Sequence, residues 1–199
     1  MLALRNAPGR PERARLEALL GSPTAQAARG LIGQVLVRRM RGGACAARIV
    51  ETEAYLGEAD PAAHVFRGPT PRTAPLYERP GTLYVYFIYG MHHCLNLAVD
   101  GPGVPGCVLS RAAEPLPGAG LAPDACRGPG RLCRALGIDR RLSGRHVFEE
   151  DPPLTVREGA PPRRLKSTPR VGIRHAAGRR LRFVDPASPV VSSGRPGVV

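Results

Sequence analysis

The chain has 199 residues, 43% of them hydrophobic, which is enough for one globular domain with its own core. Its 22 prolines and 24 glycines exclude a plain helix bundle and favour short strands joined by loops. Lys and Arg number 29 against 16 Asp and Glu, so the net charge is +13 and we expect a polyanionic partner, nucleic acid before an anionic membrane.

Cysteine usage and hydropathy bear on the compartment. The five cysteines are odd in number, scattered and not arranged in CxxC pairs, so we expect reduced thiols rather than disulfides or a zinc site. No segment reaches the roughly 20 apolar residues of a membrane span, and the N-terminus lacks the apolar region of a secretory signal. We expect an intracellular protein of the cytoplasm or nucleoid with no membrane partner. It should be a single domain over residues 1–199, with loose termini at 1–10 and 190–199.

Two helices and a hairpin are predicted first along the chain. Residues 15–20 form a short amphipathic pattern that a glycine ends, and the serine–proline pair at 22–23 predicts the N-cap and first residue of a second helix ending near Leu31. A strand at 34–39 and a glycine-rich turn at 41–43 then lead into a second strand.

This second strand carries an acidic stretch at residues 48–56. In an extended chain, a period of two places Glu51, Glu53 and Tyr55 on one face. The opposite face would then hold Val50, Thr52, Ala54 and Leu56. Acidic side chains are rarely buried without a partner, so the stretch is either a functional site or a strand with one solvent-exposed face.

A long connection and an antiparallel meander follow. Residues 57–81 are rich in proline and glycine and carry His64 and Arg72, and a connection of this length is usually functional. Residues 82–88 are the strongest predicted strand, and short turns join it to the strands that come next, as in a meander. The elements predicted after it are a hairpin tip at 89–93, strands at 94–99 and 107–113, a glycine-led helix at 128–137, and short strands at 154–157, 168–173 and 181–184.

The tyrosines are confined to one part of the chain. All five lie between Tyr55 and Tyr89, and tryptophan is absent. Aromatic residues in strands are ordinarily core, but their clustering beside Glu53, His64 and Arg111 in a basic protein suggests a stacking pocket for a nucleobase. Because a hairpin tip gives a large ring nothing to pack against, Tyr89 suggests the exposed wedge of an enzyme that unstacks DNA.

Two further groups of residues could take part in chemistry. Arg111 interrupts an apolar strand, which is costly unless it binds a carboxylate or another anion, and Glu53 is the expected partner. His92, His93 and Cys94 are adjacent in a predicted strand, so their side chains point to opposite faces and do not predict a metal site.

Together, several segments resemble the alkyladenine (3-methyladenine) DNA glycosylase family, in its order and spacing from about Ala27 to Phe183. They are residues 48–56, 62–64, 70–72, 80–91, 96, 108–115, 128–136 and 169–173. The resemblance implies an α+β fold: a single mixed domain around a curved antiparallel β-sheet with flanking helices, from which a β-hairpin protrudes into the DNA minor groove.

The resemblance also implies roles for particular residues. Glu53 corresponds to the general base, Arg111 to the residue that fixes it and the attacking water, and Ile173 to a backbone carbonyl that contacts this water. The implied base pocket consists of the rings of Tyr55, His64 and Tyr86, which sandwich the flipped base, and the amide of Asn96, which crowds a guanine 2-amino group. The implied contacts to the DNA helix are Tyr89 as the intercalating residue with Tyr84 and Met91 in support, and Arg72, Gly128 and Arg131 at the backbone.

The activity so implied is that of a base-excision-repair glycosylase. It would flip an alkylated or deaminated purine out of duplex DNA, hydrolyse its N-glycosidic bond with a Glu-activated water and leave an abasic site, as a monomer without a cofactor or metal. Lyase activity requires an amine in the pocket. Because Lys166, the only lysine, lies outside the pocket motifs, we expect a monofunctional enzyme. The preferred base stays open among 3-methyladenine, 7-methylguanine, hypoxanthine and ethenoadenine, and His64 is a candidate proton donor for the neutral ones.

The sequence departs from the family pattern in two places. The loop between His64 and Thr70 is one residue shorter than in another member of the family, and a shortened basic segment follows Ile173. Both differences bear on the pocket floor and on the substrate range.

Two other functions compete with the one that the resemblance implies. A metal-dependent nuclease could use the oxygen-rich set Glu51, Glu53, Asp60 and His64. A non-enzymatic architectural DNA binder would explain the charge and Tyr89, but not acidic residues at the centre of a DNA-binding surface.

Overall fold

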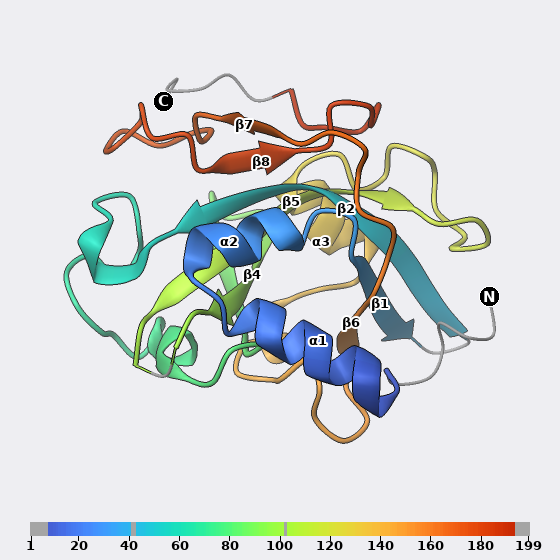
Figure 1. The fold of residues 1–199 in the computed structure, drawn as a ribbon, viewed down its shortest axis with the longest axis horizontal. Helices are drawn as coiled ribbons and strands as arrows, with labels where there is room; N and C mark the ends of the chain where they lie inside the picture. Colours follow the sequence, from blue (N-terminus) through green and yellow to red (C-terminus); the bar gives the residue numbers. More distant parts are fainter. Residues whose placement is uncertain (1–7, 41–42, 102, 194–199) are drawn as a thin grey trace.

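The computed structural model describes residues 8–40, 43–101 and 103–193. Its strands are β1 (Val35–Met40), β2 (Gly43–Tyr55), β3 (Leu83–Ile88), β4 (His92–Val99), β5 (Gly106–Pro115), β6 (Leu154–Arg157), β7 (Lys166–Thr168) and β8 (Arg182–Val184). Its α-helices are α1 (Arg10–Leu20), α2 (Thr24–Gly30) and α3 (Pro129–Ala135), and short 3-10 turns lie at Gly57–Ala59, Ala74–Tyr77 and Arg140–Leu142. The curled antiparallel sheet with three helices confirms the predicted α+β class (Figure 1).

The long strand β2 is the spine of this sheet. The strand order is β3-β4-β5-β2-β1-β6, so β5 lies along one edge of β2. The other edge is shared, because β1 pairs with residues 43–48 and β8 with residues 51–53. Figure 1 shows the β7–β8 pair beyond β2, on the side away from α1. The acidic stretch therefore has a neighbouring strand on each side.

A bulge in β2 changes which residues face the core. The register with β5 shifts on both sides of Glu51. As a result Ile49 and Ala54 both reach the main hydrophobic cluster, whereas Val50 packs instead with Ala112 and Val190. The predicted face shared by Val50 and Ala54 is therefore wrong, because one extra residue reverses the alternation.

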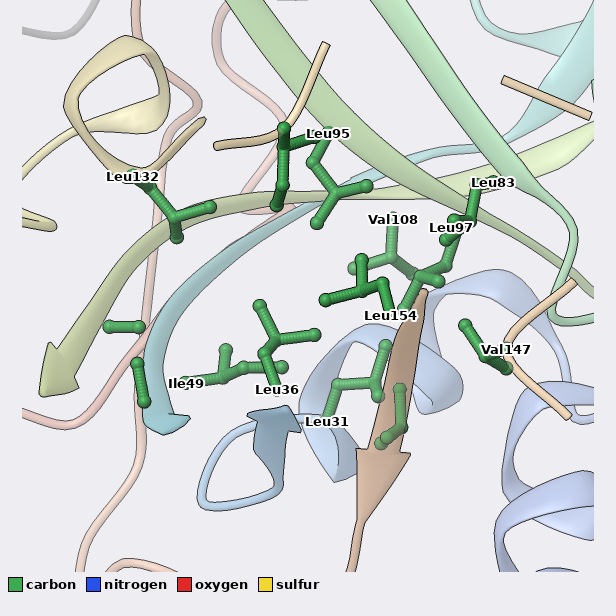
Figure 2. Close-up of a cluster of buried hydrophobic side chains, with 14 of the residues drawn as sticks. Leu31, Leu36, Ile49, Leu83, Leu95, Leu97, Val108, Leu132, Val147 and Leu154 are labelled. Carbon is green, nitrogen blue, oxygen red and sulfur yellow. The ribbon is translucent and has the colours of Figure 1, made fainter. Parts of the chain in front are cut away.

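The main hydrophobic cluster lies on the helix side of the sheet. Side chains from α1, the end of α2, α3 and strands β1, β2, β3, β4, β5, β6 and β8 meet in it. Figure 2 shows aliphatic side chains from these elements converging, with Leu36 and Ile49 beside Leu31 and with Leu95 and Leu132 above them. A second, smaller cluster on the opposite face contains Tyr84 and Cys107. This second face carries the candidate site.

Several boundaries differ from the sequence-based expectation. Helix α1 starts at Arg10, earlier than predicted, because a proline at its second position favours helix initiation. Ser22 does not cap α2; its hydroxyl donates to the carbonyl of Leu19, and Asp100 accepts from the amide and hydroxyl of Thr24 at 2.9 Å each. Strand β4 starts at His92, so the hairpin turn is shorter than the predicted tip.

The C-terminal third holds the largest corrections. The predicted strand at 168–173 is wrong over most of its length, since β7 is Lys166–Thr168 and the residues after it form an irregular segment. The predicted loose terminus is wrong for residues 190–192: Val190 is 4% exposed, and Ser192 is hydrogen-bonded to a buried carboxylate. Residues 1–7 and 194–199 of the predicted loose termini, and 41–42 of the predicted turn, lie outside the described part of the chain.

Candidate active site

A cavity of about 510 Å³ opens on the second face of the sheet. Its walls come from the last residue of β2, the 61–65 loop, strands β3 to β5, the first residues of α3 and the irregular segment 171–175. The volume is in the range of small-molecule sites. Of the residues predicted for the site, the cavity is lined by Tyr55, His64, Tyr84, Tyr86, Tyr89, Asn96, Arg111 and Ile173.

The aromatic residues form a wall rather than a finished sandwich. The rings of His64 and Tyr86 are 4.6 Å apart and almost perpendicular, so they are in contact and leave no room for a base between them. The Nδ1 atom of His64 lies 3.0 Å from the hydroxyl of Tyr84, and burial raises the pKa of this tyrosine to about 12. Both rings line the cavity, as does Tyr55. Tyr84, which lies in β3 of the hairpin, contacts His64 in the pocket, and its support of Tyr89 stays a prediction.

Asn96 is held in the floor of the cavity by the backbone. It is 3% exposed, its side-chain amide donates to the carbonyl of Tyr84 at 3.2 Å, and its oxygen faces the Cys107 thiol at 3.8 Å. Burial raises the pKa of this thiol to about 12, so Cys107 stays protonated. A fixed amide can discriminate between bases by shape and by hydrogen bonding.

Glu53 lies directly behind the cavity wall and is fully buried. Oε1 accepts a hydrogen bond from the amide of Val171 at 2.7 Å, and Oε2 accepts one from the Tyr55 hydroxyl at 2.9 Å. The Arg111 guanidinium reaches Oε2 at 3.4 Å. Burial, followed by the charge of Glu53, raises the pKa of Tyr55 well above its ordinary value, so the phenol remains a donor. The burial of Glu53 excludes the alternative that it lies on a solvent-exposed face of the strand.

The predicted pairing of Arg111 with Glu53 is present, but Glu51, also fully buried, is the closer partner of this arginine. Arg111 Nε donates to Glu51 at 2.9 Å and Arg182 Nε donates to the same oxygen at 2.7 Å. The amide of Ser192 donates to the other oxygen at 2.6 Å, and its hydroxyl adds a further bond. Burial alone would lower the pKa of Arg111, but the carboxylates of Glu53 and Glu51 outweigh it and raise the pKa. Glu51 thus anchors the arginine that reaches Glu53.

The β3–β4 hairpin places an exposed ring at the mouth of the cavity. Tyr89 and Gly90 have φ values of 55° and 68°, the left-handed pair of a type I′ turn, and the amide of Met91 donates to the carbonyl of Ile88 at 3.3 Å. This conformation is strained for tyrosine. Tyr89 is 71% exposed and Met91 68% exposed. The tip therefore projects an apolar surface next to the pocket.

With this geometry established, comparison with known proteins identifies the family. The family model for methylpurine-DNA glycosylases matches residues 18–189, most of the chain. The chain belongs to the methylpurine-DNA glycosylase family.

Curated proteins similar in sequence to this chain carry names of the same family. A protein of Methanocella arvoryzae, provisionally named a 3-methyladenine DNA glycosylase, is 43% identical over 188 residues, which cover 88% of this chain and 94% of the relative. A protein of Anaeromyxobacter dehalogenans with the same provisional name is 45% identical, over 91% of this chain and 86% of the relative. The mouse DNA-3-methyladenine glycosylase is 41% identical over 85% of this chain and 58% of its own length. The family places the chain among glycosylases of DNA damage and repair.

The residues expected to contact the DNA backbone differ in how available they are to bind a phosphate. Arg72 is exposed on the 57–81 connection. Gly128 precedes α3 with a φ of 116°, which is accessible mainly to glycine. Arg131 is already paired, because its guanidinium donates to Asp124 at 2.8 Å. Arg72 therefore offers a guanidinium for which no ion pair is seen in the described residues, whereas Arg131 would have to exchange partners.

Several site residues were not anticipated from the sequence. The Val171 amide, Arg182 and Ser192 bind the two buried carboxylates, and Arg174 and His175 line the mouth of the cavity. The resemblance marked residues 169–173 as a motif, so it pointed to the segment but to the carbonyl of Ile173 rather than to the amide of Val171. Ile173 lines the cavity, and a water contact of its carbonyl stays a prediction.

The charges near the cavity do not form a metal centre in the described residues. No group of three His, Cys, Asp or Glu side chains within ligand range is found there. Glu51, Glu53 and Asp60, the acids of the competing nuclease hypothesis, each have an arginine partner instead. In the described parts of the chain no helix is long and apolar enough to cross a membrane.

Proposed function

We propose that the protein is a monofunctional DNA glycosylase that flips a damaged purine into the described cavity and hydrolyses its N-glycosidic bond with a water molecule activated by Glu53. The observation that carries the proposal is the placement of Glu53: a fully buried carboxylate bound to a ring and a guanidinium that line an aromatic cavity. A carboxylate buried this deeply is maintained by specific donors, and these donors also fix its direction.

The acceptor sites of Glu53 leave capacity for a water molecule. A carboxylate offers about four lone-pair sites. The Val171 amide, the Tyr55 hydroxyl and Arg111 use three of them. Water bound at the remaining site could lose a proton to Glu53 while it attacks C1′ of the sugar. General-base assistance of this kind typically accelerates a reaction about 10²–10⁴-fold.

The rest of the cavity fits a purine whose bond to the sugar is already weak. Alkylation at N3 or N7 makes the purine a cation, and cations bind favourably against aromatic faces such as those of Tyr55 and Tyr86. The negative charge of Glu53 stabilises the oxocarbenium-like sugar, as carboxylates do in glycoside hydrolysis. Tyr89 would occupy the gap left in the base stack, and extrusion costs least at damaged pairs.

For neutral damaged bases the site offers no clear proton donor. Partial burial and the nearby Arg72 lower the pKa of His64, so its ring is neutral near pH 7. This argues against the expectation that His64 donates a proton. We therefore propose cationic alkylpurines, 3-methyladenine and 7-methylguanine, as the preferred substrates.

Product analysis on a duplex with a single 7-methylguanine tests the proposal. In the presence of a chelator, the enzyme should release the free base and leave an intact strand that breaks only after alkali treatment. Borohydride should trap no covalent adduct, and Lys166→Gln should release base at the rate of the parent protein, because Lys166 is exposed on β7 and does not line the cavity. Strand cleavage without alkali that the chelator abolishes would instead identify a nuclease.

A further inference from the structure

Asp60 and Arg170 form a fully buried ion pair next to the cavity. The Arg170 guanidinium donates to both carboxylate oxygens, with 2.9 Å between Nη2 and Oδ1, and neither side chain has exposed surface. Burial opposes the charge of Asp60, but the hydrogen bonds from Arg170, Leu56 and Ala62 and the charge of Arg170 together outweigh it and lower the pKa of this carboxyl. The pair joins the 57–81 connection to the segment after β7, two regions far apart in the sequence.

Each partner also holds a part of the proposed site. Asp60 accepts hydrogen bonds from the amides of Leu56 and Ala62, at 3.2 Å each, and so fixes both ends of the short turn that precedes His64. Arg170 donates to the carbonyl of Ala54 at 2.9 Å. Asp60 and Arg170 therefore clamp the chain on both sides of Tyr55.

The position of Arg170 relative to Tyr55 and Glu53 connects the pair with the chemistry. Its guanidinium lies over the Tyr55 ring, 4.7 Å from the centroid. The next residue, Val171, donates its amide to Glu53. Arg170 thus contacts one donor of Glu53, Tyr55, through its side chain and is joined to a second, the Val171 amide, through its own backbone.

A purely structural ion pair does not account for all of these features. A buried pair is often no more stabilising than apolar side chains of similar volume. In addition, Arg170 Nε is buried with no hydrogen-bond partner in the described part of the protein. The guanidinium therefore forgoes one hydrogen bond while lying over Tyr55, which suggests that this placement serves the site.

We propose that the Asp60–Arg170 pair is a positioning element of the active site: it holds the Tyr55 ring and the Val171 amide in the arrangement that orients Glu53. This inference rests on the proposed glycosylase function. It assigns to neither residue a contact with the base or the sugar. Its effect must therefore appear in the chemical step rather than in DNA binding.

The double variant Asp60→Asn/Arg170→Met tests this role, because it removes both charges and leaves neither uncompensated. We expect the single-turnover rate of 7-methylguanine release to fall about 10²-fold, the loss typical of a small misplacement of catalytic groups. Affinity for a duplex with an abasic-site analogue should change little. The matched control is Glu12→Gln/Arg157→Met, which removes the remote ion pair between α1 and β6 and should leave the rate unchanged.

Two further variants separate positioning from folding. Arg170→Lys keeps the charge but loses the bidentate fork and the planar contact with Tyr55, so a folded protein with a reduced rate is expected. In a Tyr55→Phe background, which lacks the hydrogen bond to Glu53, the double replacement should cause a smaller loss than in the parent.

The outcomes distinguish the two proposals. If the parent releases base and the double variant releases it at the same rate, the positioning role is wrong and the proposed function stands. A loss that is equal in rate and in DNA affinity and fully additive with Tyr55→Phe would likewise reduce the pair to a structural element. If the parent protein releases no base at all, the proposed function fails, and the positioning role with it.

Discussion

The tip of the β3–β4 hairpin and the charged residues around β2 belong to the same candidate site but differ in burial: the tip is exposed, and the charged residues are buried. At the tip, Tyr89 is 71% exposed and its backbone is strained. Around β2, the carboxylates of Glu51, Glu53 and Asp60 are completely buried, and arginines and backbone amides bind each of them.

The difference teaches how folding and function are divided in this protein. Under the proposed function Tyr89 enters DNA and therefore cannot also be buried in the fold, so the tip should be easy to change without unfolding the chain. Groups that have to be aimed at a sugar carbon need fixed donors, so the charges around β2 should affect stability and activity together. The following experiments test this division, from the largest expected effect to the smallest.

Replacement of Glu51 by alanine should produce the largest loss of stability. Arg111 and Arg182 would lose their shared carboxylate, and breaking a buried charge cluster typically costs about 3–5 kcal/mol. Base release should also fall, because Arg111 would no longer be anchored beside Glu53. The matched control is Glu114→Ala, which breaks a partly exposed pair with Arg48 and should cost less than about 1 kcal/mol. Urea unfolding measures both, and equal losses would contradict the division.

Replacement of Tyr89 by glycine should have effects of opposite sign on activity and stability. Loss of the stacking ring, worth about 1–3 kcal/mol, should slow base release about 10- to 100-fold. The free energy of unfolding should rise by about 1 kcal/mol, because glycine adopts the left-handed conformation without strain. Val104→Ala, at another exposed apolar side chain, is the control for both measurements. A stability loss in Tyr89→Gly would show that the fold depends on the tip.

The salt dependence of DNA binding should separate two arginines. The logarithm of the binding constant should fall linearly with the logarithm of salt concentration. Arg72→Gln should reduce this slope by about one, as for the loss of one phosphate contact. Arg131→Gln should reduce it less, since Arg131 is already paired with Asp124. Fluorescence anisotropy over a salt series gives both slopes, and an inverted order would contradict the assignment of Arg72.

The pH dependence of stability should show a small contribution from His64. Its pKa is lowered in the folded protein, by partial burial and then by Arg72. Below the ordinary value of about 6.5, the unfolded chain therefore binds a proton that the folded chain does not, and stability falls as pH decreases toward the folded pKa. His64→Gln should lose less stability than the parent between pH 7.5 and pH 5.5 in urea unfolding. Parallel losses would show that His64 does not titrate in this way.

Much of the fold was predictable because local patterns dominate it. The alternation in 82–88 predicted β3, the glycine-rich turn predicted the β1–β2 hairpin, and β6 was predicted with its observed bounds. The resemblance placed Glu53, Arg111 and the tyrosines in one site, and the cavity brings the ring-bearing residues together.

The missed features depend on contacts between distant parts of the chain. The β2 bulge, the pairing of β8 with β2 and the bonds of Ser192 to Glu51 all follow from tertiary packing, which a short sequence window does not contain. Arg111 binds Glu53 as predicted, but Glu51, its nearer partner, was not predicted. Asp60 and Arg170, separated by 110 positions, carried no local signal of their pairing.

The most direct test of the account is the single-turnover release of 7-methylguanine by Glu53→Gln, measured in chelator beside its affinity for a duplex with an abasic-site analogue. The amide nearly preserves the shape of the side chain but cannot act as a general base. The account therefore predicts a rate at least about 10²-fold below that of the parent. Binding of the analogue duplex should be retained. Base release by Glu53→Gln at the parental rate would contradict the claim that Glu53 activates the attacking water.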